Sequence, residues 1–465
     1  MRDMTKGPIG EHVVHMAMFI ALTMAFQTLY FLADLFWVGR LGKEAVAGVG
    51  LAGNLTFLVL ALTQSLSVGA TSLIAQALGR KDHRRAELLF NQSLVLSTIV
   101  GLGFGTAVFA LRGAYSSGLA ADHATATLCL QYLTWFVPAL FMQFPLVAMG
   151  AALRGMGDVR FPTAIQVATV LLNIVLAPTL MFGWITGRPL GVAGTAIASL
   201  VSVTVGVLAF TGYFLRKASP MRFRRQDWRP LLGLWRDMLR IGLPAGGEFA
   251  LMSGYMMLVY GIIRPFGAAA QAAFGIGLRL IQSLFLPVVA IGFAAAPVAG
   301  QNYGARLGGR VRHTFYIAAS MSAVVMLVAL LLCTLVPGAM VRIFNADPAV
   351  IGFGSDYLRI ASWSFLASGV IFVSSSMFQG MGNTLPALAS SSLRVVLFML
   401  PAFVLSRRPG FQLRELWYLS VASIWVQLTV NLLLLRREFG RKLQSPDSPT
   451  QRVGAVAASS VREID

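Results

Sequence analysis

Long apolar stretches separated by short polar or basic segments recur along the whole chain. A transmembrane helix needs about 20 mostly apolar residues, and we find twelve such stretches, six in each half of the chain. Their centres lie near Met24, Leu62, Val100, Leu140, Leu172 and Val203, and near Ser253, Leu286, Val325, Ala367, Val395 and Val426. The pattern predicts an all-α integral membrane protein with twelve transmembrane helices.

The two halves carry the same landmarks at a constant offset of 225 positions. The matching landmarks are Gly42 and Gly50 with Gly267 and Gly275, residues 75–79 (AQALG) with 300–304 (GQNYG), and residues 154–158 (RGMGD) with 379–383 (QGMGN). Six helices per half give both copies the same orientation. We therefore expect two six-helix lobes related by a parallel internal repeat, an arrangement typical of transporters that rock two halves about a central site.

The expected domains follow from this repeat. An N-lobe covers residues 1–215, a basic linker 216–240, a C-lobe 241–437 and a disordered tail 438–465. The linker combines several arginines with Trp228, which is typical of a segment that lies on an anionic lipid leaflet.

Composition places the chain in the membrane class. Charged residues make up only 12% of it and apolar residues 57%, whereas a soluble domain carries roughly 25% charged residues. The net charge of +19 does not indicate a nucleic-acid partner, because the cations lie in loops that flank apolar spans. The two cysteines, Cys129 and Cys333, lie in separate apolar stretches and are interpreted as small core residues.

The basic residues concentrate in alternate loops, which fixes an expected orientation. The loops that are rich in basic residues contain Arg80, Lys81, Arg84, Arg85, Arg154, Arg160, the linker arginines, Arg306, Arg310, Arg312, Arg436, Arg437, Arg441 and Lys442. The positive-inside rule makes these loops, and hence both termini, cytoplasmic. We expect a multi-pass protein of the plasma membrane, which in a bacterium is the inner membrane.

Two acidic residues lie inside apolar segments, where a charge is costly and indicates a functional site. They are Asp34 in the first span and Glu248 near the start of the seventh. Neither is repeated, because at the offset of 225 Asp34 corresponds to Val259 and Glu248 to Thr23. We interpret both as ion-coupling and substrate-binding residues on a symmetric scaffold.

Each acid also has a structural explanation, as an interfacial residue near a helix end. Asp34 precedes Gly39 by about 7 Å of helix. Glu248 follows Pro244, Gly246 and Gly247, which indicates a loosened helix lining a cavity. The sequence leaves both explanations open.

Carboxylates suit ion-coupled transport for a chemical reason. In a low-dielectric cavity a carboxyl group binds and releases a proton near neutral pH, and its charged form attracts an organic cation or coordinates sodium. When proton and substrate compete for one acid, their movements are coupled as antiport.

Other polar residues in the spans are candidates to support these acids. Gln27, Asn173 and Thr195 are predicted to support Asp34, although interhelical hydrogen bonds are an alternative role for each. Arg279 and Arg394 lie in apolar C-lobe segments. They are interpreted mainly as structural pairing partners, with lipid binding or snorkelling as alternatives.

Enzymatic functions find little support. The histidines lack metal-ligand spacing, and no phosphate-binding loop ends in Lys-Ser/Thr. We therefore expect no enzyme activity, no cofactor and no bound metal, and a process that ATP does not drive within this chain. A receptor or structural protein would not explain two acids in a duplicated apolar scaffold.

Several motifs together resemble the multidrug and toxic compound extrusion (MATE) family over about residues 4–437. They are residues 4–9 (MTKGPI), 27–34 (QTLYFLAD), 38–42 (VGRLG) with Ala45, Val46 and Ala47, 153–158 (LRGMGD) and 300–305 (GQNYGA). The resemblance implies a V of two lobes, alternating access, and efflux of mostly cationic compounds in exchange for protons or sodium.

The resemblance also assigns individual positions. Asp34 matches the coupling acid of the N-lobe, Glu248 the seventh-helix glutamate of the C-lobe, and Thr195 a polar partner. Asn173 matches the asparagine of an Asn-x-x-x-Asp-Pro pattern whose aspartate is Ala177 here. An acid found in the tenth helix of some members falls near Ser368. These losses favour protons over sodium, because a hard cation requires several oxygen ligands.

We therefore expect a proton-coupled antiporter, monomeric in the lipid bilayer, that exports small organic cations. A sodium-coupled drug antiporter is the first alternative. A flippase for lipid-linked precursors is the second, and it would be expected to carry more cations in its central cavity and extra helices.

Overall fold

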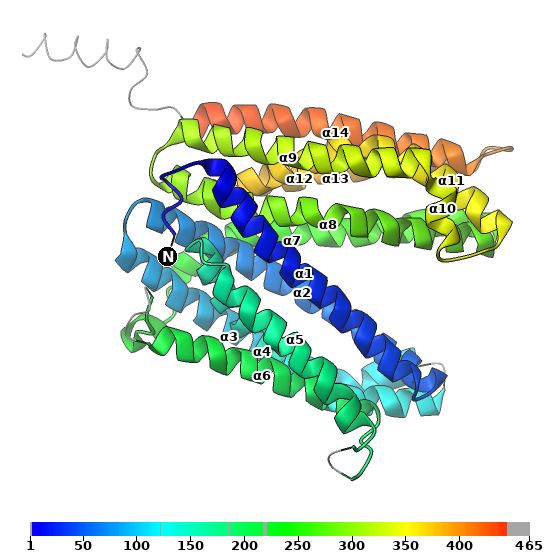
Figure 1. Cartoon of the computed structure of the whole chain (residues 1–465), viewed down its shortest axis with the longest axis horizontal. Helices are drawn as coiled ribbons and strands as arrows, with labels where there is room; N and C mark the ends of the chain where they lie inside the picture. Colours follow the sequence, from blue (N-terminus) through cyan, green and yellow to red (C-terminus); the bar gives the residue numbers. More distant parts are fainter. Residues whose placement is uncertain (1, 121, 185–186, 217–220, 444–465) are drawn as a thin grey trace, which may run out of the picture.

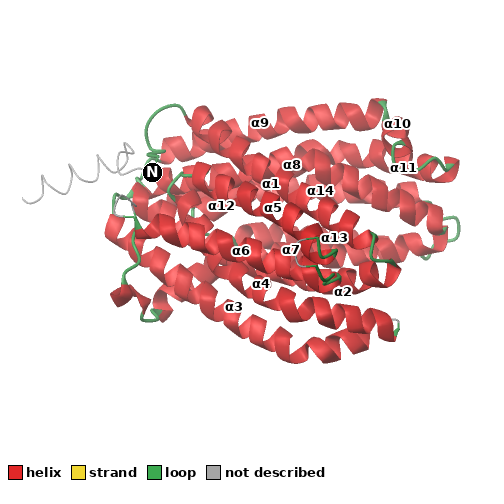
Figure 2. Cartoon of the chain, turned by 60° about the horizontal axis from the view of Figure 1, so that its bottom comes forward, coloured by secondary structure: helices red, strands yellow, loops and turns green. Residues whose placement is uncertain are grey.

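The computed structural model describes residues 2–120, 122–184, 187–216 and 221–443. Within these ranges the chain is helical apart from short loops (Figure 2). Twelve spans have the length and apolar content to cross a membrane, and each contains one of the predicted centres. The prediction of an all-α protein with twelve transmembrane helices is confirmed.

The helices form two groups. The N-lobe contains α1 (Ile9–Gly39), α2 (Lys43–Gly79), α3 (His83–Leu119), α4 (His123–Gly155), α5 (Arg160–Met181) and α6 (Val192–Leu215). The C-lobe contains α7 (Leu232–Ile263), α8 (Ala268–Gly304), α9 (Gly308–Leu335), α10 (Pro337–Arg342), α11 (Pro348–Ala361), α12 (Phe365–Gly380), α13 (Leu385–Leu405) and α14 (Leu413–Lys442). Helices α11 and α12 together make the tenth span.

The two lobes meet at one end and diverge toward the other (Figure 1). The end where they meet carries the basic loops, and we call it the arginine-rich end. It includes the loop between α2 and α3, the linker, the loop between α8 and α9, and the end of α14. The arrangement is therefore a V whose vertex lies at the arginine-rich end.

The internal repeat is visible in the backbone. Three residue pairs at the offset of 225 share a left-handed conformation, namely Gly42 and Gly267 (φ 110° and 88°), Gly157 and Gly382 (74° and 72°), and Lys81 and Arg306 (61° and 59°). A positive φ is uncommon for residues other than glycine, so the shared Lys81 and Arg306 geometry marks the same turn in both halves. The parallel repeat predicted from sequence landmarks is confirmed.

Helix α1 begins against one lobe and ends in the other. Val13 and Met16 are buried together with Ala294 of α8 in one apolar cluster. About four turns further on, the hydroxyl of Tyr30 lies 3.1 Å from that of Ser199 in α6. Figure 1 shows the resulting diagonal course of α1 from the C-lobe to the N-lobe.

Helix α7 makes the equivalent crossing in the other direction. Met238 belongs to the apolar cluster of the N-lobe, and Gly242 packs its backbone against the carbonyl of Ser65 in α2. Further along, the hydroxyl of Tyr255 lies 2.9 Å from that of Ser420 in α14. Both candidate acids lie on these two crossing helices.

The backbones of α2 and α8 touch at the vertex. A Cβ atom added at Gly79 would overlap the carbonyl of Gln301, and one added at Gly304 would overlap the carbonyl of Gln76. The two contacts are related by the repeat offset, so glycine is required at the same place in both halves.

Helix α7 begins at Leu232, inside the stretch 216–240 predicted as linker. The preceding segment from Met221 to Leu231 lies against α3. Asn91 and Gln92 of α3 are completely buried and bind its backbone, since Asn91 Nδ2 donates to the carbonyl of Arg222 at 2.9 Å and Gln92 Nε2 to that of Arg229 at 2.7 Å. Below we call residues 221–231 the strap.

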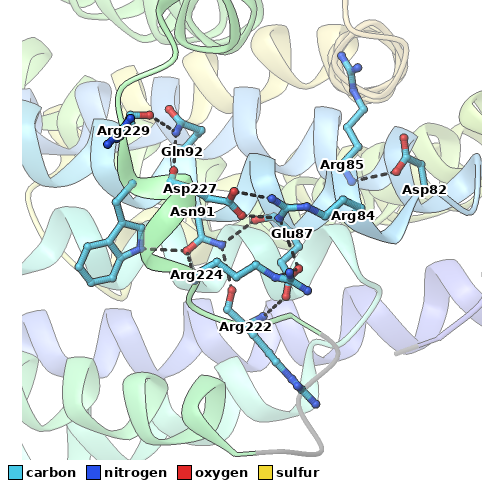
Figure 3. Close-up of polar contacts among 11 residues, drawn as sticks. Asp82, Arg84, Arg85, Glu87, Asn91, Gln92, Arg222, Arg224, Asp227 and Arg229 are labelled. Atoms are coloured by element: carbon cyan, nitrogen blue, oxygen red, sulfur yellow. Dashed lines mark hydrogen bonds and ion pairs between the residues drawn. The ribbon is translucent and has the colours of Figure 1, made fainter.

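Ion pairs add to the attachment of the strap (Figure 3). Both guanidinium Nη atoms of Arg84 donate to the carboxylate of Asp227, and Arg224 pairs with Glu87. The hydrogen bonds from Arg84 hold the pKa of Asp227 below its usual range. Trp228, expected at the lipid headgroups, is half exposed and donates to Asn91 Oδ1 at 3.1 Å.

At the C-terminal boundary of the C-lobe in the sequence, α14 continues to Lys442. It therefore includes the first residues of the tail predicted over 438–465. Residues 444–465 lie outside the described residues.

Candidate functional site

Asp34 lies on the last turns of α1, where that helix belongs to the N-lobe. Helix α1 ends at Gly39, so the residue sits about 7 Å inside the helix end. Its side chain is half-buried, and among the described residues it makes no hydrogen bond and no ion pair. Tyr30 and Tyr132 are close enough to interact with its charge.

A short chain of hydroxyl and amide groups leads away from Asp34. Tyr30 lies one turn earlier on α1, on the same face of the helix. Its hydroxyl lies 3.1 Å from the hydroxyl of Ser199, which also accepts a hydrogen bond of 3.1 Å from Asn173 Nδ2. The link joins α1, α6 and α5 beside the acid.

The predicted supporting residues take different positions. Asn173 is buried and reaches the neighbourhood of Asp34 through Ser199 and Tyr30. Thr195 is also buried, but its hydroxyl donates to the carbonyl of Val192 in its own helix at 2.9 Å. Gln27 is exposed on α1, with no hydrogen bond to another described residue.

Position 177, where the Asn-x-x-x-Asp-Pro pattern has its aspartate, is a buried alanine in α5. The second carboxylate that the pattern would supply near Asp34 is therefore absent. No three His, Cys, Asp or Glu side chains gather at one place in the part of the chain that the structure describes.

Glu248 lies in the middle of α7, just beyond the contact of that helix with α2. Gly246 packs directly against the hydroxyl of Ser65, and a Cβ at Gly247 would meet Leu388 of α13 at 3.3 Å. The glutamate side chain is half-buried. It too has no hydrogen bond or ion pair with any residue in the described ranges.

The two acids lie at different depths. Glu248 corresponds by the repeat to Thr23 of α1, and Thr23 precedes Asp34 by about 16 Å along the helix. Glu248 is therefore nearer the vertex and Asp34 nearer the divergent end of the V. A ligand moving between the lobes would meet them in succession.

Comparison of the two repeats shows how the surroundings of Asp34 in the N-lobe differ from the equivalent place in the C-lobe. Tyr255 is the repeat equivalent of Tyr30, and its hydroxyl also contacts a serine in the last helix of its own lobe, although this serine, Ser420, corresponds by the offset to Thr195 and not to Ser199. The C-lobe equivalent of Asp34, however, is Val259, which is completely buried. The same framework carries a carboxylate in one lobe and an apolar core residue in the other.

The two intramembrane arginines are not paired with acids. Arg394 places its guanidinium carbon 5.0 Å from the ring centroid of Tyr255, a cation–π geometry. Arg279 is exposed on α8. Because neither forms an ion pair with a described carboxylate, the expectation of structural ion pairing for them is wrong.

The sequence interpretation missed Tyr30, Tyr132 and Ser199. Hydroxyl-bearing residues are ordinary components of membrane helices, so composition gave no indication of their role. One indication was available, because Tyr30 and Tyr255 are themselves a pair at the offset of 225.

Comparisons with known proteins agree with this architecture. The family model named MatE matches residues 20–179 and again residues 244–404, so one family unit occurs twice in the chain at the offset of the repeat. A crystal structure described as MATE in the straight conformation is 25% identical, covers 95% of this chain and 99% of its own, and superposes with a TM-score of 0.87.

Curated relatives match over nearly the full length. The probable multidrug resistance protein YpnP of Bacillus subtilis is 27% identical over 89% of this chain and 90% of its own length. A protein of Shewanella oneidensis described as an FAD transporter is 25% identical over 85% of this chain and 88% of its own.

Proposed function

Because this chain belongs to the MatE family of multidrug efflux transporters, we propose that it exports small organic cations in exchange for protons. It is a multi-pass membrane protein that works as a transporter. The exchange occurs by alternating access, in which the V opens first on one side of the membrane and then on the other. It requires no cofactor, no nucleic acid and no second subunit.

The orientation belongs to the proposal. Basic loops face the cytoplasm in most membrane proteins, which puts the arginine-rich end and both termini on the cytoplasmic side of a bacterial inner membrane. The V is then closed toward the cytoplasm and open outward. This is the state in which an exporter releases its substrate and takes up the coupling ion.

The observation that carries the proposal is that Asp34 has no counter-ion in the part of the chain that the structure describes. An ionised carboxylate within a membrane span is costly unless a positive charge compensates it. Tyr30 and Tyr132 offer hydroxyl groups but no charge. A bound proton or a bound organic cation therefore neutralises Asp34, and the two compete for the same group.

Protons are favoured over sodium by the oxygen atoms available. Sodium is a hard cation that requires several oxygen ligands. Position 177 supplies a methyl group instead of a second carboxylate, so a sodium ion beside Asp34 would have to draw its further ligands from neutral oxygens such as those of Asn173, Ser199 and Tyr30. Proton exchange needs only the carboxylate itself.

Glu248 provides a second carboxylate nearer the vertex. It has no protein counter-ion among the described residues, so the same argument applies to it. We assign to Glu248 the binding of a proton or of a cationic substrate during passage between the lobes. The substrate binds there before it reaches Asp34, and the proton binds there after it has left Asp34.

Transport in proteoliposomes tests the proposal. Purified protein is reconstituted, a fluorescent organic cation is added, and movement of the cation is followed after a pH gradient is imposed. We expect Asp34→Asn to abolish gradient-driven transport and Glu248→Gln to reduce it strongly. Glu415→Gln is the matched control, because Glu415 is an exposed carboxylate in the first turn of α14.

The alternatives give different results in the same vesicles. Transport that follows a sodium gradient at constant pH would identify sodium, and not the proton, as the coupling ion. Movement of a fluorescent lipid-linked precursor, with no movement of organic cations, would favour a flippase. Unchanged pH-driven transport in both acid variants would refute the proposed mechanism.

A further inference from the structure

A cavity of about 340 Å³ opens at the arginine-rich end, where the two lobes meet. Its walls come from Leu73 of α2, the first turns of α7, the turn between α12 and α13, and the end of α14. The volume falls within the range of small-ligand sites, roughly 300–1,000 Å³. The proposed transport mechanism does not use this cavity.

Positive charge dominates the lining. Arg240 of α7 and Arg441 of α14 are exposed, and neither forms an ion pair with another described residue. Lys442 also faces the cavity, but it is engaged with Glu438 at 2.9 Å and with the carbonyl of Met381 at 3.0 Å. Arg240 and Arg441 are therefore the two cations that remain available to a ligand.

One carboxylate opposes this charge. Asp237 lines the cavity one turn before Arg240 and is exposed, and within the described ranges it has no ion-pair partner. The lining carries three cations and one acid, so it remains net positive even with Lys442 neutralised by Glu438.

The start of α13 adds hydrogen-bond donors. Leu385, its first residue, and Asn383 both line the cavity. Thr384, at the N-cap position, donates its hydroxyl to the carbonyl of Ile241 and does not cap the helix. Pro386 carries no amide hydrogen, so the amides of Leu385 and Ala387 are the ones that this 21-residue helix leaves without a side-chain acceptor in its first turn, and such a helix end attracts anions.

We propose that this cavity binds the phosphate group of an anionic phospholipid. Arg240 and Arg441 pair with the phosphate oxygens, because a guanidinium matches phosphate in charge and in its paired donors. The amide of Leu385, which lines the cavity at the start of α13, completes the set of donors. The same phosphate chemistry is present in soluble phosphate compounds, which the experiment below distinguishes from lipid.

Binding at this place joins the two lobes. Leu73 belongs to the N-lobe, and the first turns of α7 that carry Arg240 pack on that lobe through Met238. Asn383 and Arg441 belong to the C-lobe. A phosphate held between Arg240 and Arg441 therefore stabilises the state in which the arginine-rich end is closed.

The proposal is tested by direct binding, which does not depend on transport. Full-length protein in neutral detergent is titrated with phosphatidylglycerol, and bound lipid is counted by native mass spectrometry. Each basic residue near an anionic lipid contributes about fivefold in affinity. We therefore expect the double variant Arg240→Gln/Arg441→Gln to bind roughly 30-fold more weakly than the unmodified protein.

The control removes the same charge from the same end of the molecule. Arg436 and Arg437 are exposed on α14 and do not line the cavity, so Arg436→Gln/Arg437→Gln should leave the affinity nearly unchanged. Arg240→Lys/Arg441→Lys keeps the charge and should restore most of the binding. This third variant also separates lost binding from faulty folding.

Two further arms identify the source of the phosphate. Phosphatidylcholine should bind far more weakly than phosphatidylglycerol, and an excess of inorganic phosphate should not displace bound phosphatidylglycerol. Displacement by inorganic phosphate would overturn the assignment to lipid in favour of a soluble phosphate compound. Equal losses of lipid in both glutamine double variants would overturn the site itself. Either outcome leaves the proposed proton exchange at Asp34 untouched.

Discussion

Gln76 Nε2 donates a hydrogen bond of 2.9 Å to the carbonyl of Gly380 across the lobe interface. The bond has a twin, because Gln301 Nε2 donates to the carbonyl of Gly155 at 3.0 Å. Both donors and both acceptors are pairs at the repeat offset. The vertex is therefore closed by two equivalent bonds, one contributed by each lobe.

The close backbone contact beside these bonds predicts the effect of Gly79→Ala. The new Cβ would overlap the carbonyl of Gln301, which is backbone and cannot rotate away. Overpacking of this kind costs about 1–3 kcal/mol, and separation of the lobes at the vertex relieves it. We expect the distance between spin labels at the exposed positions His83 and His313 to lengthen in the variant.

Gly53→Ala is the matched control in the same helix. No atom lies within 4 Å of a Cβ at Gly53, and alanine is favoured over glycine in a helix. The label distance should therefore stay the same. Equal distances in the Gly79→Ala variant and the unmodified protein would show that the glycine contact does not hold the vertex.

The segment before α1 also ties the two lobes together. The amide of Arg2 donates to the carbonyl of Met156 in the N-lobe at 3.2 Å, and the amide of Met4 donates to Gln301 in the C-lobe at 3.0 Å. Arg310 Nη2 donates to the carbonyl of Gly7 at 2.9 Å. Opening of the arginine-rich end must therefore break the hydrogen bonds of this segment either to the N-lobe or to the C-lobe.

Arg310→Gln should loosen this segment. A hydrogen bond from a charged donor contributes about 1.5–3 kcal/mol, so we expect amide hydrogen exchange in residues 2–8 to become about tenfold faster or more. Arg312→Gln, which alters an exposed arginine two residues away, should leave the exchange unchanged. Equal exchange in both variants would contradict the role given to Arg310.

The ion pair between Asp227 and Arg84 predicts a dependence of stability on pH. Hydrogen bonds from Arg84 lower the pKa of Asp227 in the folded protein. A lowered pKa contributes stability above the unfolded value of about 3.9 and loses it as pH falls through the folded pKa. Asp227→Asn should therefore lower the melting temperature equally at pH 7 and pH 5.5, and the difference from the unmodified protein should shrink below about pH 4.

The control for this titration is Arg225→Gln, an exposed residue in the same turn of the strap. It should give the same melting temperature as the unmodified protein at each pH. A difference for Asp227→Asn that persists unchanged down to pH 3 would show that the carboxylate charge is not what holds the strap.

The repeat supplies a matched pair for testing the surroundings of Asp34. Tyr30→Phe removes the hydroxyl that contacts Ser199, one helical turn from Asp34. Tyr255→Phe removes the equivalent hydroxyl in the lobe that has Val259 in place of Asp34. Each variant loses one bond of similar length. We expect Tyr30→Phe to reduce pH-driven transport severalfold and Tyr255→Phe to leave it nearly unchanged; equal effects would assign both tyrosines a structural role only.

Much of the fold could be predicted because its determinants are local or repeated. Twelve apolar stretches are individually long enough to span a bilayer, and glycines such as Gly42 and Gly267 recur because the same turn recurs. The crossing of α1 and α7 between lobes could not be predicted, since Val13 and Met238 look like any other apolar residues. Only tertiary packing decides which lobe covers them.

The site was predicted in part. Asp34 and Glu248 are conspicuous because acids are rare in apolar spans, whereas the hydroxyl of Ser199 is inconspicuous in a membrane helix. The attachment of the strap to α3 was missed for a different reason. Its basic residues suggested a lipid surface, but Glu87 of α3 pairs with Arg224, and the buried Asn91 and Gln92 bind the backbone of the strap into the protein.

The central claim is that one carboxylate exchanges a proton for a cationic substrate. It is tested most directly by counting protons in weakly buffered detergent solution while a tetraphenylphosphonium salt is added to the purified protein. The account predicts that binding releases protons from the unmodified protein near neutral pH, and that Asp34→Asn suppresses this release whereas Glu415→Gln does not. Undiminished proton release from Asp34→Asn, or saturable binding to the unmodified protein without any release, would contradict it.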